Sequence, residues 1–148
     1  MFLEENELYN KKFKLPVAIS FSAKLENGDD EVIPWFSANK MGWGPKCDAL
    51  TWYLGNGDYT FRFKGYELMN NPELLGDNYI KPVPEKEYQM SCIITETSAK
   101  YSINGIMYAK VGYPAGTLAS SGYFGFHTPR NKSNIDISKL SVRPLPSA

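Results

Sequence analysis

A strict alternation of apolar and polar side chains near the N-terminus constrains the fold more than any other feature of the sequence. Between residues 15 and 25 the larger apolar side chains occupy odd positions, whereas Ser20, Ser22 and Lys24 occupy even positions. Successive side chains of a β-strand point to opposite faces of a sheet, so a period of two predicts a strand with one buried face.

The same period returns along the chain, interrupted by clusters of turn-forming residues. Gly55-Asn56-Gly57-Asp58 is typical of a tight turn between antiparallel strands. Asn104-Gly105 favours a type I′ turn, because both of its central residues need positive φ. A turn is also predicted at residues 26–30. The predicted strands after the first are residues 32–38, 49–54, 59–64, 88–94, 99–103, 106–111, 122–127 and 135–142.

The last predicted strand changes phase in its middle. Ile135 and Ile137 share one face, but Leu140 and Val142 fall on the other face when the alternation is counted without interruption. A β-bulge inserts one extra residue into a strand and so restores the phase. We therefore predict a bulge near Ser138-Lys139.

Residues 66–86 do not alternate. They contain Asn70-Asn71-Pro72, Gly76-Asp77-Asn78 and two later prolines, which interrupt helices and strands alike. We predict a long irregular connection with one short helical turn at Pro72 to Leu75. Long connections inside compact domains are often functional, so this segment is a candidate rim of a binding site.

The regular spacing of strands and turns, without a convincing amphipathic helix, predicts an all-β fold of antiparallel sheets. The chain has 148 residues and no repeat, low-complexity tract or linker. We expect a single domain over residues 1–148, folded as a two-sheet β-sandwich. A chain of this length can bury a core without disulfides or metals.

The charge balance argues against two classes of partner. The 16 Lys and Arg residues are matched by 16 Asp and Glu residues, so the chain lacks the positive field that nucleic acids and anionic membranes attract. No apolar run of about 18 residues predicts a spanning helix, and the N-terminal residues do not resemble a signal peptide. We therefore expect a cytoplasmic protein that binds neither nucleic acid nor membrane.

The two cysteines, Cys47 and Cys92, are compatible with one disulfide or with two buried thiols. A reducing compartment favours the buried thiols. Together with His127, the only histidine, they are too scattered to predict a zinc site. We expect no metal and no cofactor.

The C-terminal third of the chain carries three motifs in a fixed order. They are Tyr101-Ser102-Ile103-Asn104-Gly105, then Ser121 to Phe126 (SGYFGF), then Ile135 to Val142 (IDISKLSV). Their order and spacing resemble the end of a concanavalin A-like lectin/glucanase jelly roll, and the chain is similar to small laminin-G-like and sugar-processing modules of that superfamily. The resemblance implies a jelly-roll sandwich that holds a carbohydrate or similar polar ligand on its concave sheet.

One catalytic motif of that superfamily is missing. Laminarinase-type glycosidases carry Glu-x-Asp-x-x-Glu on one strand, which sets the acid and the nucleophile on the same face. No such motif occurs in this sequence. Because a fold does not fix a function, the resemblance favours a binding module over a hydrolase of this type without deciding between them.

Aromatic residues make up 14% of the chain, and indole rings stack on the C–H faces of sugars. Trp43 lies in a loop broken by glycines and a proline, where packing does not easily explain it, so it is the foremost stacking candidate. Trp52 and Tyr53 are further ligand-binding candidates. Trp52, like Trp35, lies in a strand pattern that more often indicates a core residue.

Polar candidates complete the predicted site. Arg62 can bind hydroxyls or a carboxylate if the polar face of its strand is the concave one, and is otherwise an ordinary surface cation. Asp48 could pair with Arg62 or orient a ligand. His127 ends a predicted strand beside Arg130. These two are ligand-contact candidates, and His127 is alternatively a general acid or base, or simply an exposed residue at a strand end.

Three functions remain open from the sequence. The first is a module that binds a carbohydrate or other polar small-molecule ligand. The second is a small enzyme of the same fold, a lyase, hydrolase or isomerase acting on a sugar or other metabolite, with His127 as general acid or base and Arg62 assisting. The third is a structural or interaction subunit whose aromatic residues form a homodimer interface.

Overall fold

The computed structural model describes residues 11–26, 32–38, 49–54, 61–63, 67–68, 73–74, 83–127 and 135–146. These residues form twelve β-strands and no helix, so none of their segments is a helix long and apolar enough to cross a membrane. The predicted all-β class is confirmed. In chain order the strands are β1 (Phe13–Lys14), β2 (Val17–Leu25), β3 (Ile33–Ser37), β4 (Ala49–Thr51), β5 (Arg62–Phe63), β6 (Glu67–Leu68), β7 (Glu73–Leu74), β8 (Glu87–Ile94), β9 (Ser98–Ile103), β10 (Ile106–Gly112), β11 (Ser121–His127) and β12 (Ile135–Pro144).

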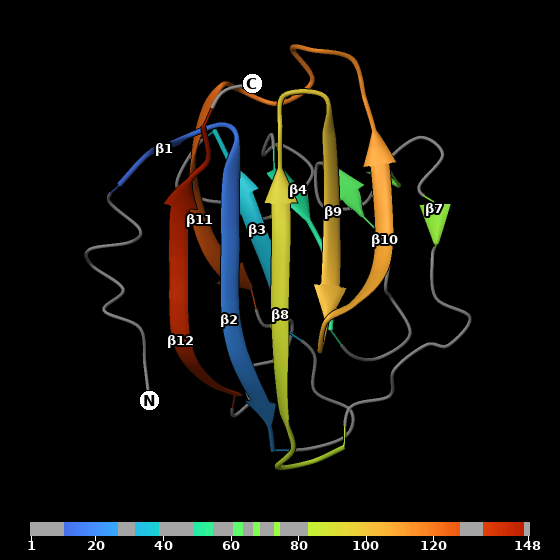
Figure 1. The fold of residues 1–148 in the computed structure, drawn as a ribbon, viewed down its shortest axis with the longest axis vertical. Coiled ribbons are helices and arrows are strands. Elements are labelled where there is room, and N and C mark those ends of the chain that lie inside the picture. Colours follow the sequence, from blue (N-terminus) through green and yellow to red (C-terminus); the bar gives the residue numbers. More distant parts are fainter. Residues whose placement is uncertain are drawn as a thin grey trace.

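The strands form two six-stranded antiparallel sheets, stacked as two layers (Figure 1). We call them the β2 sheet, with strand order β12-β2-β8-β9-β10-β7, and the β3 sheet, with strand order β1-β11-β3-β4-β5-β6. The chain crosses between the layers after β1, β2, β6, β10 and β11. This interleaving of early and late strands is that of a jelly-roll β-sandwich, as predicted.

Strand β2 confirms the alternation predicted for residues 15–25. All of its odd positions are buried, and it pairs with β12 on one side and β8 on the other. Aromatic rings fill the space between the layers. Phe126 lies edge-on to Phe21 with ring centroids 4.8 Å apart, and Phe61 lies edge-on to Tyr101 with centroids 5.1 Å apart. The core therefore consists of the two inner faces, joined by aromatic contacts from both sheets.

Strand β12 contains the predicted bulge. Its pairing with β2 shifts register between Ser138 and Ser141, and Lys139 adopts a φ of 55°. Beyond the shift, Leu140 and Val142 pack against the core. The extra residue therefore returns the apolar side chains to the inner face.

The turn between β9 and β10 also agrees with prediction. Asn104 and Gly105 adopt φ values of 53° and 81°, as a type I′ turn requires. The Asn104 backbone N–H donates to the Gln89 carbonyl, and its side-chain Oδ1 accepts from the Gln89 N–H, both at 2.8 Å. These two bonds tie the turn to the neighbouring strand β8.

The close approach of β11 to β3 depends on Gly122. A Cβ built at this position would lie 2.6 Å from the Phe36 ring and 2.8 Å from the Ser37 carbonyl oxygen. Real Cβ atoms do not approach other atoms so closely, so only glycine fits here without displacement. The motif SGYFGF therefore has a packing reason for its first glycine.

The connection at residues 66–86 differs from prediction. Glu73 and Leu74 are not in a helical turn but form β7, paired with Lys110 and Ala109 of β10. The unpaired edge of β10 offers backbone partners, and this tertiary pairing outweighs a weak local preference for helix. The neighbouring strands β6 and β7 belong to different sheets. Whether the segment forms the rim of a site is not decided, because most of it lies outside the described residues.

Cys92 is a free, buried thiol on the inner side of β8. Burial raises its pKa, because the charged thiolate would lose its hydration. A buried, protonated thiol is a poor nucleophile. The buried-thiol interpretation is confirmed for Cys92, whereas Cys47 lies outside the described residues.

Candidate ligand-binding face

Alternation along β3 and β4 divides their side chains between two faces. Phe36 and Leu50 belong to the core between the sheets. Their neighbours Trp35, Ser37 and Thr51 therefore lie on the opposite face, which points away from the β2 sheet. Trp35 and Thr51 are directly paired across the two strands. We call this surface the outer face of the β3 sheet.

The central residues of this outer face are as buried as the core. Trp35 is 5% exposed, Thr51 0% and Tyr53 3%. Thr51 Oγ1 donates a hydrogen bond of 3.4 Å to the Tyr53 hydroxyl. An outer sheet face is usually polar and solvated, so this collection of aromatic rings and hydroxyls requires an explanation beyond the packing of the core.

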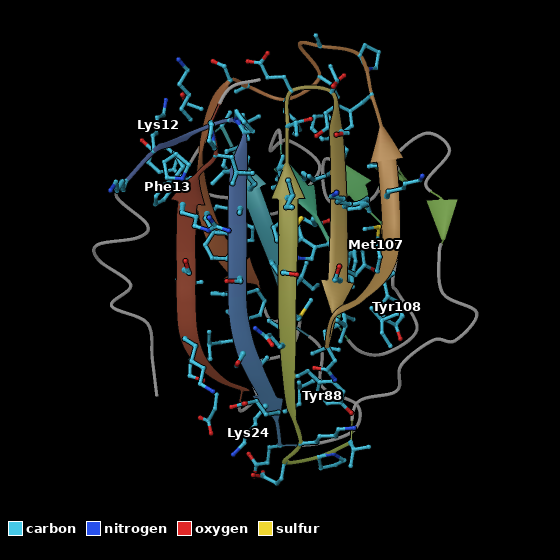
Figure 2. The ribbon with its side chains drawn as sticks, viewed as in Figure 1. Lys12, Phe13, Lys24, Tyr88, Met107 and Tyr108 are labelled. Atoms are coloured by element: carbon cyan, nitrogen blue, oxygen red, sulfur yellow. The ribbon has the colours of Figure 1, made fainter. Side chains whose placement is uncertain are left out.

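The margin of the same face, at β1 and β11, is more exposed. Lys12 and Lys14 are exposed, and Ser121 and Tyr123 are half-buried. Lys14 is paired with Ser121. The Lys12 Nζ atom lies over the Tyr123 ring, 5.6 Å from its centroid, a distance at which the ring attracts a cation. Figure 2 shows Lys12 beside Phe13 at the start of the chain's first strand.

Strand pairing places two of the predicted site residues in this sheet. Arg62 of β5 is paired with Thr51, and His127 of β11 is paired with Ile33. Ile33 is two residues from Trp35, the partner of Thr51. Arg62 and His127, although far apart in the sequence, therefore occupy neighbouring cross-strand rows. Their placement as a pair of ligand contacts stays a prediction.

Trp52 and Tyr53 point to opposite faces. The Trp52 side chain lies in the core with no exposed surface, stacked on Phe124 with ring centroids 6.4 Å apart. Its Nε1 has no hydrogen-bond partner among the described residues. This position corresponds to the core role that the strand pattern indicated for Trp52, and it leaves no ring surface for stacking on a ligand. Tyr53 lies on the outer face.

The remaining predicted contacts fall outside the described residues. These are Trp43, Asp48 and Arg130. In the sequence, Trp43 and Asp48 precede β4, and Arg130 follows β11. Their roles remain predictions.

Among the described residues, the titratable groups with shifted pKa values lie between the layers rather than on the outer face. Burial raises the pKa of Tyr113 and, to a smaller degree, that of Tyr108. A tyrosine whose pKa is raised keeps its proton at neutral pH, so neither is suited to act as a general base. Within the described residues, no three His, Cys, Asp or Glu side chains come close enough to hold a metal ion.

Several outer-face residues were not anticipated, namely Lys12, Lys14, Ser37, Thr51 and Tyr123. A signal for the first two exists in the sequence. Lys12 and Lys14 alternate with Phe13 and Leu15, both of which are buried in the core, so the period of two begins earlier than residue 15. Tyr123 lies inside the SGYFGF motif, between residues whose role is packing.

No protein-family model matches the chain, and no curated protein matches it. Solved structures do match. A candidate glycosyl hydrolase from Parabacteroides distasonis aligns with a TM-score of 0.65 and 13% identity, over 91% of this chain and 80% of that one. A protein of unknown function with a galectin-like fold, from Bacillus subtilis, aligns with a TM-score of 0.68 and 13% identity, over 89% and 73%.

A tetrameric galectin from the ball sponge Cinachyrella is also similar. It aligns with a TM-score of 0.59 and 12% identity, over 88% of this chain and 96% of that one. At such identities the likeness concerns the fold alone. The chain has the concanavalin A-like jelly-roll fold predicted from its C-terminal motifs, and its structural neighbours include a galectin, a protein with a galectin-like fold and a candidate glycosyl hydrolase.

Proposed function

We propose that this galectin-like jelly roll is a carbohydrate-binding module whose ligand lies on the outer face of the β3 sheet. The observation that carries the proposal is the chemistry of the accessible margin of that face. There the half-buried Tyr123 ring lies beside the Ser121 hydroxyl and the Lys12 and Lys14 ammonium groups. A sugar offers C–H faces to an aromatic ring and hydroxyls to such donors.

The buried centre of the face supports the margin. Tyr123 is paired with Ser37, which in turn is paired with Ala49. Both of these residues are fully buried, so the strand that carries Tyr123 rests against a packed neighbour. Contacts held by packed, rigid elements lose less conformational entropy when a ligand binds. A preformed face of this kind suits binding without rearrangement.

The structural neighbours support the same function by analogy only. One of them is a galectin, and another is described by its galectin-like fold. A shared fold raises the prior for carbohydrate binding but does not establish it. The proposal therefore depends on the residues of the face.

Hydrolysis is the second candidate function, because the neighbour from Parabacteroides distasonis is a candidate glycosyl hydrolase. Hydrolysis by the usual mechanism needs a pair of carboxylates flanking the bond. The described outer-face positions of β3, β4 and β11 contain no Asp or Glu. In this chain His127, paired with Ile33 on the same sheet, would have to supply the acid or base.

The test of binding is a glycan array followed by calorimetry on the best ligand. Tyr123→Ala should weaken binding by about tenfold or more, because it removes the ring from the face. Met107→Ala is the matched control, since Met107 is half-buried on the outer face of the other sheet. The proposal is wrong if no glycan binds, or if the two variants weaken binding equally.

The same ligand also tests the enzymatic alternative and the remaining candidates. Incubation with the protein should leave the glycan intact, as read by mass spectrometry and by release of reducing ends. Cleavage that is lost in His127→Ala would instead establish the hydrolase. Trp43→Ala, measured in the same titrations, shows whether the loop tryptophan contributes to stacking.

A further inference from the structure

Two lysines at the free edge of the β3 sheet project onto its outer face. The neighbouring Phe13 and Leu15 are buried in the core, and Lys12 and Lys14 alternate with them. Pairing of Lys14 with Ser121 and of Phe13 with Gly122 sets Lys12 opposite Tyr123. Both ammonium groups therefore stand on the same side of strand β1 as the proposed ligand.

The ammonium group of Lys12 lies over the Tyr123 ring. Its Nζ atom lies 5.6 Å from the ring centroid, within range of a cation–π attraction. The ring covers one side of the ammonium group, while Lys12 as a whole is exposed. An ammonium group has three donors, so donors remain for a ligand. Such a contact favours side-chain conformations in which the ammonium group lies over the face.

The charged side chains that the structure describes on this face have one sign. They are Lys12 and Lys14, and none of the described side chains at outer-face positions belongs to Asp or Glu. The outer face of the β2 sheet differs, because Asp136, Lys24 and Glu87 follow one another there in a single cross-strand row. Charges of one sign on a surface raise the local concentration of ions of the other sign.

The β2 sheet offers one rival cluster of cations. Lys100 and Lys110 are directly paired across β9 and β10. In the backbone register Lys110 is in turn paired with an acidic residue, Glu73 of β7. The rival cluster also lacks an aromatic ring paired across from it, since the neighbour of Lys100 on β8 is Ile93. It therefore serves as the control.

We propose that the ligand of the outer face is an acidic saccharide, with its carboxylate or sulfate group bound by Lys12 and Lys14. This inference rests on the proposed carbohydrate-binding function and names the class of sugar. Charge-assisted hydrogen bonds from two ammonium groups are stronger than those from neutral donors, and no described acid on the face competes for them.

Two matched ligand pairs test the inference by calorimetry. One is an oligogalacturonate and its fully methyl-esterified form, and the other is a sulfated galactan oligosaccharide and its desulfated form. Wild-type protein should bind the charged member of at least one pair about tenfold more tightly. This preference should shrink in roughly 0.5 M salt, where exposed charges are screened. Which pair responds distinguishes the carboxylate from the sulfate.

The variants separate this site from the rival one. Lys12→Ala with Lys14→Ala should weaken binding of the charged member much more than binding of the neutral one, and so abolish the preference. Lys100→Ala with Lys110→Ala should change neither. Tyr123→Leu should reduce the preference, because the ring no longer holds Lys12. All four lysines are exposed, and circular dichroism checks that each variant folds.

Every other outcome overturns the inference. Equal binding of charged and neutral members contradicts it and leaves the carbohydrate-binding function intact. A preference that survives in the Lys12/Lys14 variant, or that disappears in the Lys100/Lys110 variant, places the acidic group elsewhere. Absence of binding to both pairs and to a broad glycan array overturns this inference and the proposed function together.

Discussion

The two outer faces of the sandwich follow the same alternation but carry different side chains. On the β3 sheet the outer positions hold aromatic rings, hydroxyls and cations, and Trp35, Thr51 and Tyr53 among them are nearly inaccessible to solvent. On the β2 sheet the described outer positions are exposed or half-buried, apart from the buried Ser22. One of its cross-strand rows consists of serines from four neighbouring strands, Ser141, Ser20, Ser91 and Ser102.

The two outer faces also differ in charge, because the described side chains of the β2 sheet include both acids and bases. On the β2 sheet Lys139 bridges to Glu87 with Nζ and Oε2 3.5 Å apart, and both side chains are largely exposed. Such surface pairs contribute little to stability. They belong to a solvated face that needs no further explanation. Both inner faces serve the core, so our proposal for the location of the ligand rests on the difference between the outer faces.

The largest expected loss of stability comes from replacing an isoleucine, a residue that occurs on the outer face of both sheets. Ile33→Ala should lower the free energy of unfolding by about 2–4 kcal/mol, because Ile33 is buried and its removal leaves a cavity. Ile93→Ala, on the half-buried outer face of the β2 sheet, should cost about 1 kcal/mol. Urea denaturation measures both, and equal losses would contradict the difference between the faces.

The next largest effect is expected when a glycine of each sheet is replaced by alanine. Gly122→Ala should destabilise the protein by about 1–3 kcal/mol, because its Cβ would overlap the Phe36 ring and the Ser37 carbonyl. Gly112→Ala on the β2 sheet is the control, since its Cβ would meet only the Thr97 carbonyl at 3.8 Å. The tight contact between β11 and β3 is disproved if Gly122→Ala unfolds at the same urea concentration as wild type.

The third prediction concerns how the stability of the protein depends on pH through Tyr113, which follows strand β10 of the β2 sheet. Tyr113 donates its hydroxyl to the Thr95 and Ser98 carbonyls, at 2.8 and 2.7 Å. Burial, and to a lesser extent Cys92, raises the Tyr113 pKa above its ordinary 10.0. Above about pH 10, the Tyr113 hydroxyl loses its proton in the unfolded state but keeps it in the folded state. Stability should therefore fall as pH rises, by up to about 1.4 kcal/mol per unit.

Tyr113→Phe is the variant that isolates this contribution. It should cost about 1 kcal/mol at pH 7, where the hydroxyl's hydrogen bonds are intact in the wild type. Its stability should then decline less steeply between pH 10 and pH 11 than that of wild type, as measured by urea unfolding at each pH. Parallel pH profiles would show that Tyr113 does not titrate in the way its burial implies.

The smallest effect concerns the bulge at the edge of the β2 sheet. Lys139→Val should cost about 1 kcal/mol, because a β-branched residue tolerates a φ of 55° poorly. Lys139→Gly should stay within about 0.5 kcal/mol of wild type, since glycine adopts this φ readily and the lost surface ion pair is weak. Ser141→Val on the same strand controls for β-branching. If Lys139→Val left the free energy of unfolding unchanged, the strand would be able to pair without its bulge.

Local patterns in the sequence were sufficient for much of the fold. Alternation over residues 15–25 located β2, which begins at Val17; the phase change at Leu140 located the bulge, and Asn104-Gly105 located a turn. Each of these features is decided by neighbouring residues and by backbone sterics. Strands of two residues escaped prediction, because β6 and β7 are too short to show a period and form only through pairing with other strands.

The candidate face was harder to predict for a different physical reason. Alternation shows that Trp52 and Tyr53 point to opposite faces, but it does not show which of them is inside. That choice depends on how β4 lies against its neighbours, where Leu50 and Trp52 join the core. The lysines at residues 12 and 14 have no chemical motif of their own, and they gain meaning only through pairing with the strand that carries Tyr123.

Chemical-shift mapping with the best glycan from the array tests the central claim most directly. If the ligand binds the outer face of the β3 sheet, the backbone amides that shift should be those of β1, β3, β4 and β11, with Lys14 and Tyr123 among the largest changes. The serine row of the β2 sheet should remain unchanged. Shifts concentrated at Ser20, Ser91 and Ser102, with β11 silent, would contradict the assignment of the ligand to the β3 sheet.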